Sequence, residues 1–194
     1  MNHFAKNKKY HAILATGKDL FWKHGFRRVT IEEICRKAGV SKMTYYKFFP
    51  DKIELAKTVF RNVANEGEKK FKELIHSDIS PSDKIRGMIV MKMESTNHIS
   101  GEFLEDFYSG TDPELQTFVS DITVKAWNNM LEDFVLAQAK GIFRSDFKPE
   151  FLMQVSFKMV DLLKDEKLLA LYETPQDLII EFSKFVAWGI SPHP

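Results

Sequence analysis

The stretch that most constrains this chain is TIEEICRKAGVSKMTYYKFFPDKIEL, at positions 30–55. Thr30 and Glu33 fit a Thr-x-x-Glu capping box, in which the two side chains satisfy free backbone N–H groups at the start of a helix. Gly39 ends that helix, and Ser41 caps a second short helix directly afterwards. Two short helices joined by a turn that contains glycine predict a helix-turn-helix.

The second helix of this pair, expected at residues 42–48, carries side chains that suit nucleic acid. Lys42, Thr44, Tyr46 and Lys47 can reach phosphate oxygens and base edges. The alternative is that they decorate the surface of an ordinary helical bundle. Caps, turn spacing and charge agree with one another, which favours a segment that reads double-stranded DNA.

The charge of the chain is unevenly distributed, although its total is only +1. Residues 1–52 hold 12 Lys and Arg against 4 Asp and Glu, a net charge of +8, whereas the rest of the chain carries −7. A basic segment around a helix-turn-helix supports nucleic-acid binding. For the lysines near the N-terminus, a solvated tail explains the charge equally well.

Apolar residues recur at helical spacing along the rest of the chain, with Pro or Gly between the segments. After a first helix that stops at Gly25, the expected long helices cover residues 51–76, 81–98, 112–140, 149–169 and 174–189. No strand pattern is found, so the predicted fold class is all-α. We expect a small basic domain at residues 1–50 and a larger helical domain at residues 51–194.

Composition narrows the class of protein further. Apolar residues make up 44% of the chain and charged residues 28%, as in ordinary globular proteins. No apolar run approaches the roughly 18 residues that span a membrane, and the N-terminus lacks a signal peptide. We therefore expect a cytoplasmic protein without a membrane partner. The single Cys35 cannot form an internal disulfide, and a buried, inert thiol is its expected state.

The N-terminal segment from Ile13 to Leu55 resembles the TetR family of bacterial transcriptional repressors. The pieces that match are IL and LF in the first helix, then GFRRVTIEEICRKAGVS, TYYKFF, Lys52 and Leu55. The resemblance implies a homodimer with a three-helix DNA-binding head, a ligand-binding body, and a four-helix bundle formed by the last two helices of each subunit. Three positions depart from the family pattern, namely Gly17, Tyr45 and Phe48.

The resemblance also implies roles for individual residues. Thr30, Tyr46 and Lys52 would contact phosphates, while Lys42, Met43, Thr44 and Lys47 would face the major groove. With the capping Ser41 included, the expected DNA-binding residues are Thr30, Ser41, Lys42, Met43, Thr44, Tyr46, Lys47 and Lys52.

The predicted body is rich in soft and aromatic side chains, which suit an adaptable apolar pocket for an effector. They suit a plain hydrophobic core equally well, and residue by residue the core is the more common outcome. The candidate effector-binding residues are Met88, Met91, Phe103, Phe107, Tyr108, Trp127, Met130 and Phe134.

The last two predicted helices are apolar over a wide part of their surface. One antiparallel pair cannot bury all of that surface against its own chain, whereas a symmetric partner can. The predicted dimer interface comprises Phe151, Val155, Met159, Leu162, Phe182, Phe185 and Val186.

The sequence therefore predicts a transcriptional regulator, in the first instance a repressor, that binds a pseudo-palindromic operator as a dimer and is released by a small apolar or amphipathic effector. The alternative is a constitutive DNA-binding or scaffolding protein without an effector. No phosphate loop, Cys-pair metal motif or nucleophile motif is found, so we expect no enzyme activity, no cofactor and no metal.

Overall fold

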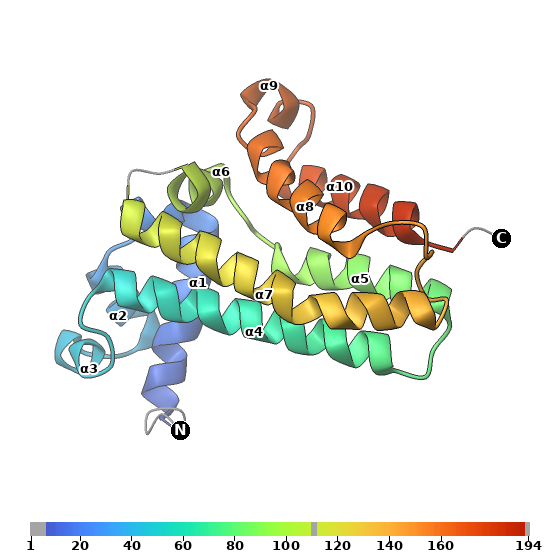
Figure 1. The fold of residues 1–194 in the computed structure, drawn as a ribbon. Helices are drawn as coiled ribbons and strands as arrows, with labels where there is room; N and C mark the ends of the chain where they lie inside the picture. Colours follow the sequence, from blue (N-terminus) through green and yellow to red (C-terminus); the bar gives the residue numbers. More distant parts are fainter. Residues whose placement is uncertain (1–6, 110–111, 193–194) are drawn as a thin grey trace. The chain divides into compact units, whose positions relative to one another are not determined.

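The computed structural model describes residues 7–109 and 112–192, and the described chain is helical without a strand (Figure 1). The all-α prediction is therefore confirmed. The elements in chain order are α1 Lys8–Arg28, α2 Ile31–Ala38, α3 Lys42–Tyr46, α4 Lys52–His76, α5 Pro81–Ser95, α6 Gly101–Leu104, the π-helix η2 Glu105–Ser109, α7 Pro113–Ala139, α8 Pro149–Leu162, α9 Glu166–Leu169 and α10 Pro175–Ile190.

The chain divides into two compact units. The first unit comprises Met1–Asn62 and His98–Asp121, and the second comprises Val63–Asn97 and Ile122–Pro194. The boundaries fall within α4 and α7, so each of these helices contributes residues to both units. The first unit thus contains α1, α2 and α3 together with α6 and η2. The functional boundary that the sequence predicts near residue 50 stays a prediction.

In the first unit, α1 lies close to α4 at a glycine. A Cβ at Gly17 would lie 3.0 Å from Leu55 Cδ2, so the departure at Gly17 from the usual family residue is explained by close helix packing. Further along α1, Trp22 packs on Phe103 with ring centroids 4.5 Å apart, and Phe60 packs on Phe107 at 4.6 Å. These rings form an aromatic core between α1, α4, α6 and η2.

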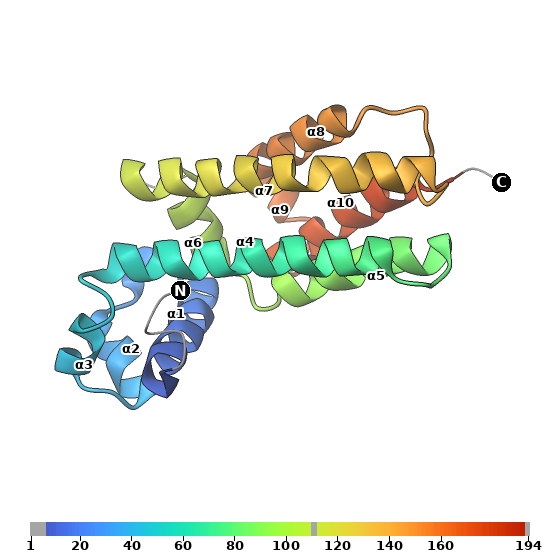
Figure 2. The same cartoon turned by 60° about the horizontal axis from the view of Figure 1, so that its bottom comes forward.

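The second unit has its own hydrophobic core, built from α4, α5, α7, α8 and α10. Phe71 on α4 stacks on Phe134 on α7 with ring centroids 4.9 Å apart, and Phe143 lies 5.4 Å from Phe134. Ile85 from α5 and Ala187 from α10 are buried in the same cluster. Figures 1 and 2 both show α5 and α10 side by side.

Three predicted segments differ from the structure in extent. The helix expected at 81–98 ends at Ser95. The helix expected at 149–169 ends at Leu162, and Asp165 starts the separate helix α9 by accepting hydrogen bonds from Lys167 N and Leu168 N. The helix expected at 42–48 ends at Tyr46. Residues 101–109, which lie between the helices expected at 81–98 and 112–140, form α6 and η2, and the Ser100 side chain caps α6 by accepting from Phe103 N.

Candidate nucleic-acid interface

Helix α2 begins and ends at the residues that the sequence indicates. The Thr30 hydroxyl accepts a hydrogen bond from Glu33 N at 3.1 Å, and Gly39 adopts the left-handed conformation with φ of 65°. The Glu33 carboxylate lies 3.4 Å from Lys37 Nζ, one turn further along the helix. Thr30 is exposed, so its hydroxyl stands at the surface where α2 starts. The turn then places Ser41 at the start of α3.

Helix α3 is fixed at its base by one buried tyrosine. Tyr45 is fully buried, and its hydroxyl donates a hydrogen bond to Asp51 O at 3.0 Å. Its ring also packs against Phe49, with centroids 5.8 Å apart. Burial raises the pKa of the Tyr45 hydroxyl, which therefore stays protonated and can donate this bond. The larger ring at this family position is accommodated because its polar end has a partner.

The opposite side of α3 is exposed and basic. Met43 is 71% exposed and Tyr46 is 53% exposed. Lys42 and Lys47 are exposed on the same short segment. Such a surface can contact base edges and phosphates together, which is what direct reading of DNA requires.

Two of the predicted contact residues also cap the helix that carries them. The Ser41 hydroxyl accepts from Thr44 N at 3.2 Å, and the hydroxyls of Ser41 and Thr44 lie 3.0 Å apart. Ser41 is exposed and Thr44 is partly buried. Their first task is therefore to hold the start of α3, because these bonds satisfy groups that the helix leaves free.

Glu32 is a neighbour of this surface that sequence reasoning missed. Its carboxylate forms an ion pair with the Lys42 ammonium, and both side chains are more than half exposed. The hydrogen bond between them raises the pKa of Lys42 and lowers the pKa of Glu32. A phosphate that binds Lys42 must compete with this carboxylate. No spacing rule links residues on two different helices, so the sequence carried no signal for the pair.

Lys52 occupies a different environment from the predicted one. Its ammonium donates to Phe26 O at 2.7 Å and to Val29 O at 2.8 Å, and it lies 4.2 Å from the centre of the Phe26 ring. Burial lowers the pKa of Lys52, and the charge of Asp106 opposes that shift. Lys52 thus ties the start of α4 to the end of α1. A phosphate contact would require it to exchange these bonds.

The structure does not bring the predicted effector-binding residues together. Phe103 and Phe107 are buried in the aromatic core of the first unit, and the Tyr108 ring lies 6.2 Å from Phe103. Phe134 is buried in the core of the second unit. The remaining four pack against that second core, and they are Met88, Met91, Trp127 and Met130. All eight thus have a packing role in one of the two cores.

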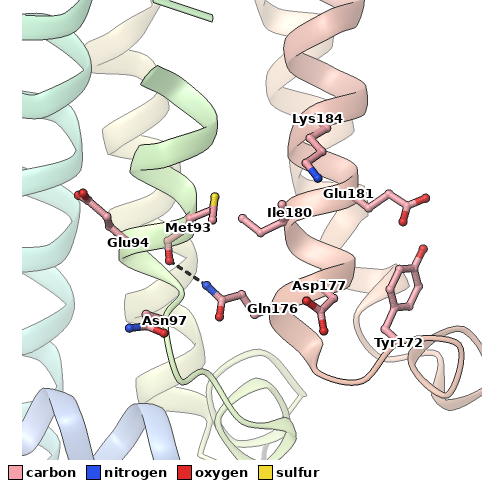
Figure 3. Close-up of a pocket in the computed structure, with 9 residues that line it drawn as sticks. All are labelled: Met93, Glu94, Asn97, Tyr172, Gln176, Asp177, Ile180, Glu181 and Lys184. Carbon is pink, nitrogen blue, oxygen red and sulfur yellow. Dashed lines mark hydrogen bonds between the residues drawn. The ribbon is translucent and has the colours of Figure 1, made fainter. Parts of the chain in front are cut away.

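A cavity of about 800 Å³ lies instead between α5 and α10 in the second unit. Met93 and Ile180 extend toward each other from the two helices (Figure 3), and Gln176 Nε2 donates to Met93 O at 2.9 Å. None of the predicted effector residues lines it. The lining residues are Met93, Glu94, Asn97, Tyr172, Gln176, Asp177, Ile180, Glu181 and Lys184.

Two of the acidic side chains of this cavity have structural partners. Glu94 lies 3.5 Å from Lys70 Nζ on α4. Asp177 forms a reciprocal capping box with Thr174, in which its carboxylate accepts from Thr174 N at 2.9 Å. The acidic lining is therefore partly neutralised, and its charge does not by itself define the ligand.

Large apolar side chains stand exposed on the last two long helices. Phe151 on α8 is 66% exposed and Phe185 on α10 is 75% exposed. Leu162 and Trp188 are exposed as well, although Trp188 was not among the predicted residues. The other predicted interface residues are partly buried, and these are Val155, Met159, Phe182 and Val186.

Comparison with known proteins identifies the N-terminal part of the chain. Residues 13–59 match the model of the family described as bacterial regulatory proteins, tetR family. This match covers α2, α3, most of α1 and the start of α4. Comparison with curated proteins gives no match.

Solved structures share the fold over nearly the whole chain. The reduced form of NemR from E. coli has a TM-score of 0.69 at 16% identity, covering 96% of this chain and 99% of its own. FadR from Bacillus subtilis, solved in complex with stearoyl-CoA, has a TM-score of 0.65 at 14% identity, with 93% and 99% covered. A Vibrio parahaemolyticus protein assigned to the TetR family of transcriptional regulators has a TM-score of 0.57 at 23% identity, with 95% and 100% covered.

The capped helix pair, its exposed basic helix and the family match over residues 13–59 assign the N-terminal part of the chain to the helix-turn-helix class of transcription regulators. Residues 13–59 match the tetR family of bacterial regulatory proteins, and solved structures that share the fold include TetR-family regulators. Within the described residues, no helix is long and apolar enough to cross a membrane. The same part of the chain holds no group of three or more His, Cys, Asp or Glu side chains arranged to bind a metal ion.

Proposed function

We propose that this protein is a dimeric, ligand-responsive regulator, in the first instance a repressor, that reads a pseudo-palindromic operator with α3. The observation that carries the proposal is the exposed surface of α3. Met43, Tyr46 and Lys47 project from a helix whose opposite side is anchored by buried Tyr45. A rigid base with an exposed basic face positions side chains for specific contacts.

The first experiment asks whether Lys47 reads bases. A duplex is selected from a random pool with the wild-type protein, and its affinity is compared between the wild type, Lys47→Ala and Lys23→Ala. We expect Lys47→Ala to cost about 1–3 kcal/mol and to relax the preference at one base position. Lys23 is the matched control, because it is an exposed lysine on α1 that pairs with Asp19 at 3.5 Å. An unchanged preferred site in Lys47→Ala would rule out this role.

The dimer proposal rests on the exposed apolar residues of α8 and α10. Phe151 and Phe185 are too exposed to stabilise the monomer by burial, and they lie on the two helices that the family resemblance assigns to the subunit interface. A twofold dimer would cover both helices and would present two copies of α3 to two half-sites of the operator.

The effector proposal rests on the cavity between α5 and α10. Met93 and Ile180 supply apolar contacts, while Asn97, Gln176 and Lys184 supply polar groups at its edge. This mixture suits a small amphipathic molecule. FadR from Bacillus subtilis, which shares the fold, was solved with stearoyl-CoA bound. A regulator of this kind acts where the chromosome lies, so the cytoplasmic location belongs to the same proposal.

A constitutive DNA-binding or scaffolding protein is the second candidate function. The observation that favours it is the burial of Phe103, Phe107 and Phe134 in packed cores rather than around a cavity. Linkage separates the two candidates, because a true effector and the operator must weaken each other's binding by the same factor. We expect screening by thermal shift to find cavity ligands that weaken operator binding about 5–150-fold. Ligands that bind the cavity and never change operator affinity would favour constitutive binding.

A further inference from the structure

Helix α1 is kinked at Gly25, and its last residues form a corner, Gly25–Val29, that leads into α2. Gly25 has φ of 72° and ψ of 178°, a conformation that side chains other than glycine rarely adopt. The corner leads directly to Thr30, which caps α2. The direction in which α2 and α3 leave α1 is therefore set by how this corner is held.

The carboxylate of Asp106 holds the corner from η2. One of its oxygens accepts from the backbone N–H of Arg27 at 2.9 Å, and the other pairs with Arg27 Nε. The side chain of Asp106 is only 4% exposed, so the carboxylate is shielded from bulk water, whereas the Arg27 side chain is 54% exposed. Charge-assisted bonds of this kind are the stronger class of hydrogen bond.

The fit between the corner and η2 leaves no room for a side chain at Gly25. A Cβ there would lie 2.4 Å from Asp106 Oδ2 and 2.9 Å from Glu102 O. Backbone and carboxylate atoms cannot both withdraw from such a contact while the bonds to Arg27 are kept. Glycine is therefore required at position 25 for two reasons, the positive φ of the backbone and the close approach of the Asp106 carboxylate.

Two further residues, Lys52 and Ser100, hold the same corner and the helical turn before it. Lys52 Nζ donates to Phe26 O and Val29 O, and Ser100 N donates to Trp22 O at 2.9 Å. Asp106 differs from these partners because it lies in a π-helical turn, a conformation that is less stable than an α-helix and is frequent at functional sites. Part of the hold on the corner therefore comes from this π-helical turn.

We propose that Asp106 is a positioning residue for DNA reading, which fixes the corner between α1 and α2 and thereby sets how α3 meets the operator. This inference rests on the proposed function, because it assumes that α3 reads an operator. It goes beyond that function by naming the side chain outside the helix-turn-helix on which accurate reading depends.

The exposed neighbour of Asp106 provides a matched control. Glu105 binds the same guanidinium, with its Oε1 atom 2.5 Å from Arg27 Nη2, yet its side chain is 61% exposed. Glu105→Gln removes one negative charge from the same turn and leaves the backbone bond to Asp106 in place. Asp106→Asn removes the same charge at a buried position, where water cannot replace the lost interaction with Arg27.

The experiment compares the wild type, Asp106→Asn, Arg27→Gln and Glu105→Gln. Affinities are measured for the duplex that the wild type selects and for a scrambled duplex of equal length, each over a range of salt concentrations. Hydrogen exchange at the Arg27 amide is measured without DNA. We expect Asp106→Asn to speed hydrogen exchange at the Arg27 amide and to lower the affinity for the selected duplex about tenfold or more. The affinity for the scrambled duplex should stay unchanged.

The dependence of affinity on salt separates positioning from a direct phosphate contact. Arg27→Gln should lower the affinity for the selected duplex without changing the slope of log affinity against log salt concentration. The double variant Arg27→Gln with Asp106→Asn should bind no more weakly than the weaker of the two single variants, because both substitutions remove the same pair. A fall in the slope by about 0.9 for Arg27→Gln would mean that the guanidinium contacts a phosphate, which overturns the pairing role.

The remaining outcomes are also decisive. The Asp106→Asn variant can show faster hydrogen exchange at the Arg27 amide and yet bind the selected duplex with the same affinity as Glu105→Gln. In that case the corner does not control DNA reading, and the inference is wrong. If Asp106→Asn does not fold, Arg27→Gln decides alone, because its side chain is half exposed. If the wild type selects no duplex, the proposed function fails first, and the exchange data still report whether Asp106 holds the corner.

Discussion

The Lys52 ammonium satisfies two carbonyl groups at the end of α1, Phe26 O at 2.7 Å and Val29 O at 2.8 Å. A lysine that is used in this way stabilises the fold of the head, because a carbonyl without a partner in a partly buried site costs free energy. Its family counterpart implies a phosphate contact instead. The two roles predict different responses to salt, so they can be separated by measurement.

We therefore expect Lys52→Ala to lower the free energy of unfolding by about 1–3 kcal/mol, because Phe26 O and Val29 O lose their donor. Operator affinity should fall without a change in its dependence on salt. A direct phosphate contact would instead reduce the log–log slope by about 0.9. Urea denaturation and binding over a range of salt concentrations supply the two readouts, and a reduced slope with unchanged stability would restore the phosphate role.

At the scale of elements, the short helices of the head depend on their caps. Helix α3 spans only Lys42–Tyr46, which is too short to be stable alone, so it depends on the Ser41 cap and on the buried Tyr45. The same residues that indicate a helix-turn-helix in the sequence therefore also hold it in place. Local chemistry of this kind can be inferred from sequence, because it involves neighbours within four positions.

The Ser41 cap gives a prediction at this scale. Ser41→Ala should destabilise the protein by about 0.5–2 kcal/mol, because Thr44 N loses its acceptor. Ser41→Asn should keep the stability, since asparagine is an equally good N-cap residue. Thermal unfolding of both variants measures the difference. Equal stability of the alanine and asparagine variants would show that the hydroxyl has no capping role.

At the scale of the whole molecule, the proposed dimer depends on apolar surface that the chain leaves uncovered. Phe185 is exposed on α10, and Phe151 is exposed on α8. We expect Phe185→Glu to yield monomers, because a charge buried at the centre of a symmetric interface is repeated in both subunits. Sedimentation measures the oligomeric state, and operator binding should be lost in parallel.

A matched substitution tests whether position matters. Val135→Glu places the same charge at an exposed apolar residue of α7, outside the proposed interface. This control should remain a dimer. A wild-type protein that sediments as a monomer at micromolar concentration would contradict the dimer, and dimers of Phe185→Glu would place the interface elsewhere.

The sequence by itself determined the all-α class, the helix-turn-helix and most helix starts. Thr30 and Ser41 cap helices where their spacing predicts, because a cap is a bond to a backbone group three residues away. The hydrogen bond from the Tyr45 hydroxyl to Asp51 O, in contrast, could not be read from the sequence. A cap joins residues only a few positions apart, so it can be recognised from the spacing of residue types in the sequence.

The tertiary structure alone decided which distant residues meet. Arg27 and Asp106 are paired although 79 positions separate them, and Gln176 bonds to Met93 across 83 positions. No periodicity encodes such pairs, so the sequence carried no signal for the bonds from Lys52 to the end of α1 or for the burial of the candidate effector residues in two cores. The physical reason is that burial and pairing depend on how helices pack, whereas composition reports only that a side chain is apolar or charged.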